Sequence, residues 1–177
     1  MRTASVKLQV NDNIATLQQG ARLLQCIDDD LYRRRIENVF ATSIGAHVRH
    51  NLGHYRIFLD ALETGDIDYS ARCRDAAIEV DRTAALTETA NICGQLHGVS
   101  ILRQDLQLQI RNSRGDACAT TSTCVSRELE FLLGHTIHHY AIIAIICRLQ
   151  DVALEEGFGV APSTLCHLES LKSACVR

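Results

Sequence analysis

The 177-residue sequence contains no tryptophan and a single proline, Pro162. Because proline is the residue that interrupts helices most strongly, its near absence leaves most of the chain free to be helical. Lysine and arginine form no run beyond "YRRR" at residues 32–35, and the formal net charge is −3. Such a charge distribution gives no electrostatic basis for binding DNA, RNA or an anionic membrane. We therefore expect neither a nucleic acid nor a membrane as partner.

The eight cysteines include no CxxC pair, and the amino terminus "MRTASVKLQV" lacks the apolar core of a signal peptide. Cysteines dispersed in this way are typical of small buried apolar residues in a reducing cytosol, whereas disulfide frameworks belong to shorter secreted chains. The longest apolar stretch, residues 131–147, is slightly short for a membrane span. The sequence predicts a soluble, cytoplasmic protein with eight free thiols.

Apolar residues recur at three- and four-residue spacing in long segments, which predicts amphipathic helices. The second begins after Ser43, a suitable N-cap, and is ended by Gly65. The other long helices are expected over residues 14–31, over residues 78–99, and from a start between Ser122 and Ser126 to about Leu154. A loop and a short last helix follow.

The periodicity changes between the third and fourth long helices. "LQLQI" at residues 106–110 alternates apolar and polar residues, "NSRGD" has turn composition, and "ACATT" can pair back, which predicts a short hairpin. No internal repeat or second domain is apparent. We therefore predict an all-α fold in which residues 1–177 form one four-helix-bundle domain, with a β-hairpin inserted between helices 3 and 4.

Histidines gather at two places on these helices. In "GHTIHHY" (residues 134–140), His135 and His139 lie about 40° apart on an inward stripe, and His138 lies about 60° to one side of His135. On the second helix, His47, His50 and His54 lie within one narrow arc. Each histidine could be a core residue satisfied by a hydrogen bond, but six on two inward stripes would each need an acceptor inside an apolar bundle.

Metal binding is the alternative, because neutral imidazole is the commonest metal ligand in proteins and an i,i+4 pair brings two ring nitrogens to one ion. The pattern is not that of a zincin protease, since Thr136 follows His135 where "HExxH" requires glutamate. We favour a metal site over a purely structural role.

Three stretches carry a resemblance to a known family. "SIGAHVRH" followed by "NLGHYRIFLDAL" resembles the second-helix signature of the DinB-like (DNA-damage-inducible) superfamily, roughly S-I-G-x-H-x-x-H. "GHTIHHY" resembles the H-x-x-x-H of its fourth helix, and "DIDYSARCRDAAIEVDRTAA" is similar to one uncharacterised branch. The likeness covers most of the chain.

The resemblance implies a bundle of up-down-down-up order with a three-histidine metal site near one end. Carried over by position, the ligands are His50, His135 and His139. His47 falls where many members have another residue, and His54 and His138 are additional, with His138 expected beside the ligands or in a structural role. Bundles of this family often pair side by side, and the apolar "AIIAIIC" (residues 141–147) adds to the expectation of a homodimer.

Three imidazoles leave an open position on a divalent ion, as catalytic sites do, whereas structural zinc sites are usually closed by four protein ligands. All-nitrogen ligation suits zinc, nickel, iron or copper without choosing among them. Because the family includes metal-dependent transferases that use small thiols, the resemblance implies an enzyme performing thiol transfer or hydrolysis on a small molecule. The alternative is a non-catalytic metal-binding bundle that serves as a sensor, a store or a structural or stress-response protein.

Two residues are candidates for a catalytic role. Glu128 lies two turns before His135 on the same face, although a glutamate in a first helical turn is also favoured by the helix dipole alone. His54 could contact substrate beside the metal. Tyr55 and Tyr140 each follow a histidine and could line the pocket or be buried tyrosines satisfied by hydrogen bonds.

Overall fold

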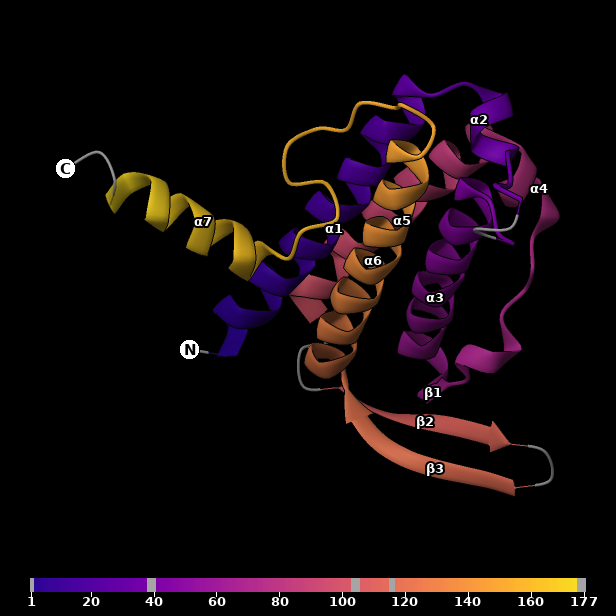
Figure 1. The fold of residues 1–177 in the computed structure, drawn as a ribbon. Helices are drawn as coiled ribbons and strands as arrows, with labels where there is room; N and C mark the ends of the chain where they lie inside the picture. Colours follow the sequence, from indigo (N-terminus) through magenta and orange to yellow (C-terminus); the bar gives the residue numbers. More distant parts are fainter. Residues whose placement is uncertain (1, 38–40, 103–105, 115–116, 175–177) are drawn as a thin grey trace.

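The computed structural model describes residues 2–37, 41–102, 106–114 and 117–174, and these form a mostly helical fold with a small three-stranded sheet (Figure 1). The long helices are α1 (Arg2–Cys26), α3 (Ile44–Thr64), α5 (Arg82–Leu102) and α6 (Val125–Arg148). Shorter helices are α2 (Asp29–Arg33), η1 (Tyr69–Ala71), α4 (Ala76–Val80) and α7 (Pro162–Ala174). The strands are β1 (Asp66–Ile67), β2 (Gln107–Arg114) and β3 (Ala117–Cys124). The predicted helical fold with a β insertion is confirmed at this level.

The four long helices enclose the core. α1 packs against α5 and α6, and α3 packs against the same two helices. Each contributes fully buried apolar side chains, among them Leu17, Phe58, Leu96 and Leu132. In consequence α3 and α6, which carry the six clustered histidines, face each other along their length (Figure 1).

Both ends of α3 follow the sequence prediction. The Ser43 hydroxyl accepts a hydrogen bond from the backbone N–H of Ala46, which satisfies one of the free donors of the first turn. Gly65 has a φ of 83°, and its N–H donates to the carbonyl of Ala61. That left-handed conformation suits glycine and ends the helix. The histidines of α3 are therefore held on a helix with fixed limits.

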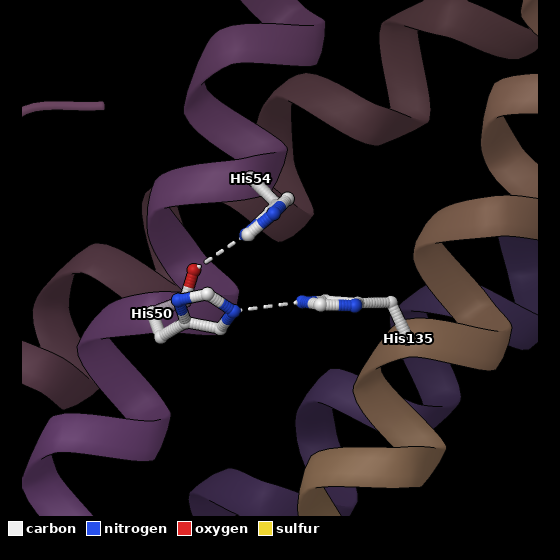
Figure 2. A group of neighbouring side chains, drawn as sticks. All are labelled: His50, His54 and His135. Atoms are coloured by element: carbon white, nitrogen blue, oxygen red, sulfur yellow. Dashed lines mark hydrogen bonds between the residues drawn. The ribbon is translucent and has the colours of Figure 1, made fainter. Parts of the chain in front are cut away.

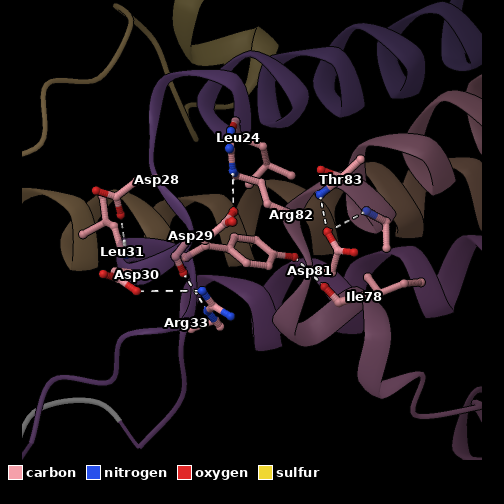
Figure 3. Close-up of polar contacts among 12 residues, drawn as sticks. Leu24, Asp28, Asp29, Asp30, Leu31, Arg33, Ile78, Asp81, Arg82 and Thr83 are labelled. Carbon is pink, nitrogen blue, oxygen red and sulfur yellow. Dashed lines mark hydrogen bonds and ion pairs between the residues drawn. The ribbon is translucent and has the colours of Figure 1, made fainter.

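Four predicted helix boundaries are wrong. The first helix begins at Arg2 and not near Ile14. It ends at Cys26, and Asp28 caps a separate α2 by accepting from the N–H of Leu31 (Figure 3). The third divides at Asp81, whose carboxylate accepts from the N–H groups of Thr83 and Ala84 and so starts α5 anew. The last long helix ends at Arg148 and not near Leu154. At Asp28 and Asp81, capping carboxylates interrupt an apolar periodicity that looks continuous in the sequence.

The predicted hairpin is present and longer than expected. β2 pairs antiparallel with β3 over eight residues in each strand, from Gln107 opposite Cys124 to Arg114 opposite Ala117. β1, which the sequence did not predict, pairs parallel with β2 directly after α3. Arg111 of β2 also forms an ion pair with Asp66 of β1. The hairpin is thus attached to the end of the helix that carries His54.

α6 is 24 residues long and, by length and composition alone, apolar enough to cross a bilayer. The estimate of a slightly short span is corrected because the helix extends beyond the apolar run of residues 131–147. The same helix packs against α1 and α3, where Leu129, Leu132 and Ile146 are fully buried. Its position in the core accounts for its apolar character.

Six cysteines are free thiols in the described part of the chain. They are Cys26, Cys73, Cys93, Cys124, Cys147 and Cys166. The side chains of Cys118 and Cys175 lie outside the described set, so the prediction of eight free thiols is met for the six that are described.

The contact between α3 and α4 leaves no room for a side chain at Gly45. A Cβ at this position would lie 2.1 Å from the carbonyl oxygen of Glu79 and 2.9 Å from the Tyr32 ring. We expect Gly45→Ala to lower the free energy of unfolding by about 3 kcal/mol, because backbone must move to relieve the overlap. Urea unfolding followed by circular dichroism measures the change.

Gly94→Ala is the matched control, since nothing lies within 4 Å of a Cβ built on that α5 residue. There, alanine should raise stability by roughly 0.5–1 kcal/mol through its better helix propensity. Equal stability of Gly45→Ala and wild type would contradict the close approach of α3 and α4.

Candidate metal centre

The predicted inward histidines meet between α3 and α6. Nε2 of His50 on α3 lies 3.0 Å from Nε2 of His135 on α6, with the two rings directed at each other across the helix interface (Figure 2). The ring of His54, one turn further along α3, has its centroid 4.2 Å from that of His135 and 4.5 Å from that of His50. One nitrogen from each of the three residues lies within 4.8 Å of the others. The group is therefore close enough to hold a metal ion.

The hydrogen bonds show which nitrogen of His54 is available. Its Nδ1 lies 2.8 Å from the backbone carbonyl oxygen of His50 (Figure 2). A carbonyl only accepts hydrogen bonds, so Nδ1 must carry the proton and Nε2 keeps its lone pair. A backbone acceptor on the far nitrogen is the usual means by which a metal-binding histidine is oriented.

The spacing of the donor atoms fits a first-row metal. With metal–nitrogen bonds of about 2.0–2.1 Å in a tetrahedral arrangement, neighbouring ligand nitrogens stand roughly 3.3 Å apart. The 3.0 Å between the Nε2 atoms of His50 and His135 is close to that value. Small side-chain adjustments would bring all three nitrogens to one ion.

His139, the third ligand predicted from the sequence, lies beside this group. Its ring centroid is 4.5 Å from that of His50 and 4.6 Å from that of His135. Its Nδ1 lies 2.8 Å from Nδ1 of His47, so one of these two rings donates and the other accepts. That contact leaves Nε2 of His139 for the centre. Ligation by His139 stays a prediction. His50 and His135 belong both to the predicted ligand set and to the group in the structure, and His54 is the third member of that group.

The remaining histidines have supporting positions. His47 is buried, and its Nε2 lies 2.9 Å from the hydroxyl of Thr42, so both of its ring nitrogens have partners. The contact between the two Nδ1 atoms thereby orients the ring of His139. His138 is exposed and makes an edge contact with His139, with ring centroids 5.2 Å apart, as expected for a residue beside the ligands.

Burial keeps the clustered imidazoles neutral. Removal from water, followed by repulsion from neighbouring histidines and arginines, lowers the pKa of His50 to about 3. The same cause lowers the pKa of His139 to about 3 and that of His54 to about 4, and it lowers the pKa values of His47 and His135 as well. Neutral imidazole is the form that binds metals, so the donor set is ready for an ion at pH 7.

These pKa values predict that the metal-free protein loses stability in acid. A histidine whose pKa falls on folding binds its proton more readily in the unfolded chain, so folding is favoured at high pH. Stability should be complete above the unfolded value near 6.5 and should decrease as the pH falls towards about 4. We expect Tm, measured by calorimetry without metal, to fall by several degrees between pH 7.5 and pH 4.5.

A variant provides the control for this pH dependence. His50→Gln combined with His54→Gln removes two of the depressed groups while retaining polar side chains. Its Tm should vary less with pH than that of wild type. Parallel Tm curves for the two proteins would show that other groups cause the acid sensitivity.

Aromatic rings border the histidines on one side. The Phe131 ring stacks on that of His135, with centroids 5.4 Å apart and planes 27° apart. Tyr69 of η1 lies with its ring centroid 5.1 Å from those of both His54 and Phe131. Tyr69 was not identified from the sequence, because a short helix in a connecting segment carries no periodicity that would place it.

The carboxylate of Glu128 is held by two hydroxyl groups, one of which belongs to Tyr69. Its side chain is buried, and its two carboxylate oxygens accept from the hydroxyl of Tyr69 at 2.7 Å and from that of Thr123 at 2.6 Å. The carboxylate thus connects the start of α6 to η1 and to β3. The two tyrosines that follow histidines are buried in the core: the Tyr55 hydroxyl donates to Asn13, and the ring of Tyr140 stacks on Phe158. For Tyr55 the structural alternative, a buried tyrosine satisfied by a hydrogen bond, holds, and Tyr140 is buried with its ring against Phe158.

Comparison with known proteins shows a partial similarity to a fungal protein. The chain matches no family model. It is 32% identical over 107 residues to FK506-binding protein 5 of Rhizopus delemar, and the matched region covers 58% of this chain. The same region is 28% of the fungal protein, so the chain spans less than a third of that relative.

Proposed function

We propose that this chain is a metal-dependent enzyme that acts on a small molecule by thiol transfer or hydrolysis. The convergence of one nitrogen each from His50, His54 and His135 is the observation that carries the proposal. Neutral imidazoles at this spacing suit zinc, nickel or iron. A divalent ion held by three imidazoles supplies a Lewis acid with a free position for a water, a carbonyl oxygen or a thiolate.

The surroundings of the histidines support catalysis over storage. The rings of Tyr69 and Phe131 give one side of the centre an apolar wall against which a small organic substrate could lie. Ring-nitrogen contacts fix both His54 and His139, and such preorganisation is what a reactive centre requires. In this proposal the chain's own residues bind and orient the substrate beside the ion.

A DinB-like bundle is part of the same proposal. The first two long helices, α1 and α3, each pack against the last two, α5 and α6. The first and second long helices, α1 and α3, are therefore diagonal to each other, as are the third and fourth, α5 and α6, whereas α3 and α5 lie side by side. Such an arrangement supports the rearranged helix order of that superfamily over a simple up-down-up-down bundle.

The second candidate is a non-catalytic metal-binding protein, and the position of His139 favours it. If the Nε2 atom of His139 joins those of the triad, four imidazoles surround the ion. Closed four-ligand sites are typical of structural metals. The number of ligands therefore separates the two candidate functions.

Metal analysis followed by activity screening tests the proposal. Protein purified without an affinity tag should contain one divalent ion per chain by elemental analysis. Screens with small thiols and with ester and amide substrates should then show turnover that a chelator removes and added metal restores. Stoichiometric metal together with no chelator-sensitive turnover would favour the non-catalytic alternative.

A further inference from the structure

The guanidinium group of Arg72, in the segment after η1, lies next to the histidine centre. Nη1 of Arg72 lies 3.5 Å from Nε2 of His54, the nitrogen that keeps its lone pair, and it also donates to the carbonyl oxygen of Tyr69. The aliphatic part of the side chain lies across α3 at Gly53, where a Cβ would be 3.4 Å from Cδ of Arg72. Because Gly53 has no side chain, the side chain of Arg72 can lie against α3 at this position and extend to His54.

Arg72 has no carboxylate partner among the described residues, and it differs from the exposed arginines Arg34, Arg74, Arg127 and Arg148, which also lack one there, in being half-buried. Burial, and then repulsion from the guanidinium groups of Arg49 and Arg74, lower the pKa of Arg72. Seven other arginines of the described chain form ion pairs: Arg22 with Glu155, Arg33 with Asp30, Arg35 and Arg49 with Glu79, Arg56 with Glu88, Arg82 with Asp29, and Arg111 with Asp66. A half-buried cation is partly desolvated, which is costly without an anion beside it.

The charges around the centre lead to the same conclusion. The triad supplies three neutral imidazoles, so a bound divalent ion would keep its full charge next to that of Arg72. The nearby carboxylate of Glu128 already accepts two hydrogen bonds, from Tyr69 and Thr123. No carboxylate among the described residues contacts the triad or pairs with Arg72, so an anionic ligand would supply the missing counter-charge.

The guanidinium also has donors to spare. Nη1 donates to the carbonyl oxygen of Tyr69 and lies beside Nε2 of His54, a contact that an ion bound to that nitrogen would replace, whereas Nε and Nη2 make no hydrogen bond to the described residues. Two parallel N–H donors on a planar guanidinium match the two oxygens of a carboxylate. The rings of Tyr69 and Phe131 stand next to the same histidines and would contact the apolar part of such a molecule.

We propose that the ligand of this centre is a small carboxylic acid, whose carboxylate pairs with Arg72 while the molecule occupies the open position of the metal. The inference rests on the metal site put forward above and names the substrate class for it. Arg72 is the residue that selects a carboxylate over a neutral analogue of the same shape.

Cobalt-loaded protein provides a readout that does not depend on turnover, because the visible spectrum of Co²⁺ changes when a ligand enters its coordination shell. Acetate is the probe and acetamide its neutral counterpart. Wild type should bind acetate with a spectral change, and acetamide should produce none at the same concentrations. Arg72→Gln should weaken acetate binding at least tenfold, and Arg72→Lys should weaken it less, since it keeps the charge but loses the fork.

Arg74→Gln is the matched control, since Arg74 is an exposed arginine two residues further along the chain. Its acetate affinity should stay within twofold of wild type, and cobalt content should be equal in all variants. Equal acetate affinity in wild type and Arg72→Gln would overturn this inference alone. If inorganic phosphate binds more tightly than acetate and depends on Arg72 in the same way, the ligand is a phosphate compound and the carboxylate inference is wrong. Failure of wild type to bind cobalt would overturn the metal site and the inference together.

Discussion

Protein in which His50 and His135 are both replaced by Ala should contain no stoichiometric metal. These two residues belong both to the ligand set predicted from the sequence and to the group that the structure brings together. If about 12 kcal/mol of metal-binding free energy is shared by four ligand positions, each lost imidazole costs roughly 3 kcal/mol. The double variant should then bind metal about 10⁴-fold more weakly, as measured by competition with a chromophoric chelator.

Single substitutions at His54 and His139 decide the third ligand. If His54 ligates, His54→Ala should lower metal affinity about 100-fold, and His139→Ala about tenfold or less, as for residues that orient ligands. The reverse order would support the set His50, His135 and His139. Equal large losses would indicate four imidazoles and a closed, non-catalytic site. His167→Ala, an exposed histidine on α7, is the control and should bind metal as wild type does.

The buried carboxylate of Glu128 gives the second large effect. Glu128→Ala should lower the free energy of unfolding of the metal-free protein by about 2–4 kcal/mol, because the hydroxyls of Tyr69 and Thr123 lose a charged acceptor. Glu128→Gln retains an acceptor oxygen and should cost about 1 kcal/mol. Urea unfolding monitored by circular dichroism gives both values.

Glu130→Ala is the control for this experiment. Glu130 is an exposed residue of the same helix that accepts one hydrogen bond from Gln9, so the loss should be about 1 kcal/mol or less. Substitutions at surface positions usually change stability by no more than about 0.5 kcal/mol. If Glu128→Ala differs from wild type by no more than that, Glu128 does not stabilise the fold. Loss of chelator-sensitive turnover in a stable Glu128→Gln would instead support the catalytic role considered from the sequence.

The elements that could be predicted from the sequence are those whose limits depend on local chemistry. Ser43 and Gly65 end α3 through contacts within four residues of themselves, and the alternation of residues 106–110 requires only a partner strand. The division at Asp81 was missed because its capping carboxylate lies inside an unbroken apolar pattern. β1 was missed because two residues carry no periodicity, and its pairing depends on a strand about 40 positions away.

The sequence predicted which two helices carry the histidine centre, but it did not predict all of the residues that surround it. The i,i+4 spacing that selected His135 and His139 also relates His50 to His54, and applying it equally to α3 would have placed His54 beside the ligands. Arg72 and Tyr69 had no such signal. Their places depend on how a connecting segment folds back over α3, and this is decided by contacts such as that between Tyr69 and Glu128, 59 residues apart.

The separation of His50 and His135 along the chain means that an ion bound between them would also stabilise the fold as a cross-link. The two residues stand 85 positions apart, so a metal between them ties the chain into a large closed loop that contains α4, α5 and the hairpin. A covalent cross-link around a loop of about 100 residues stabilises a fold by roughly 4–5 kcal/mol in the chain-entropy model. A coordinate link differs from a disulfide in that it can be released without a redox reaction, so the lifetime of this fold against proteases would follow the supply of metal.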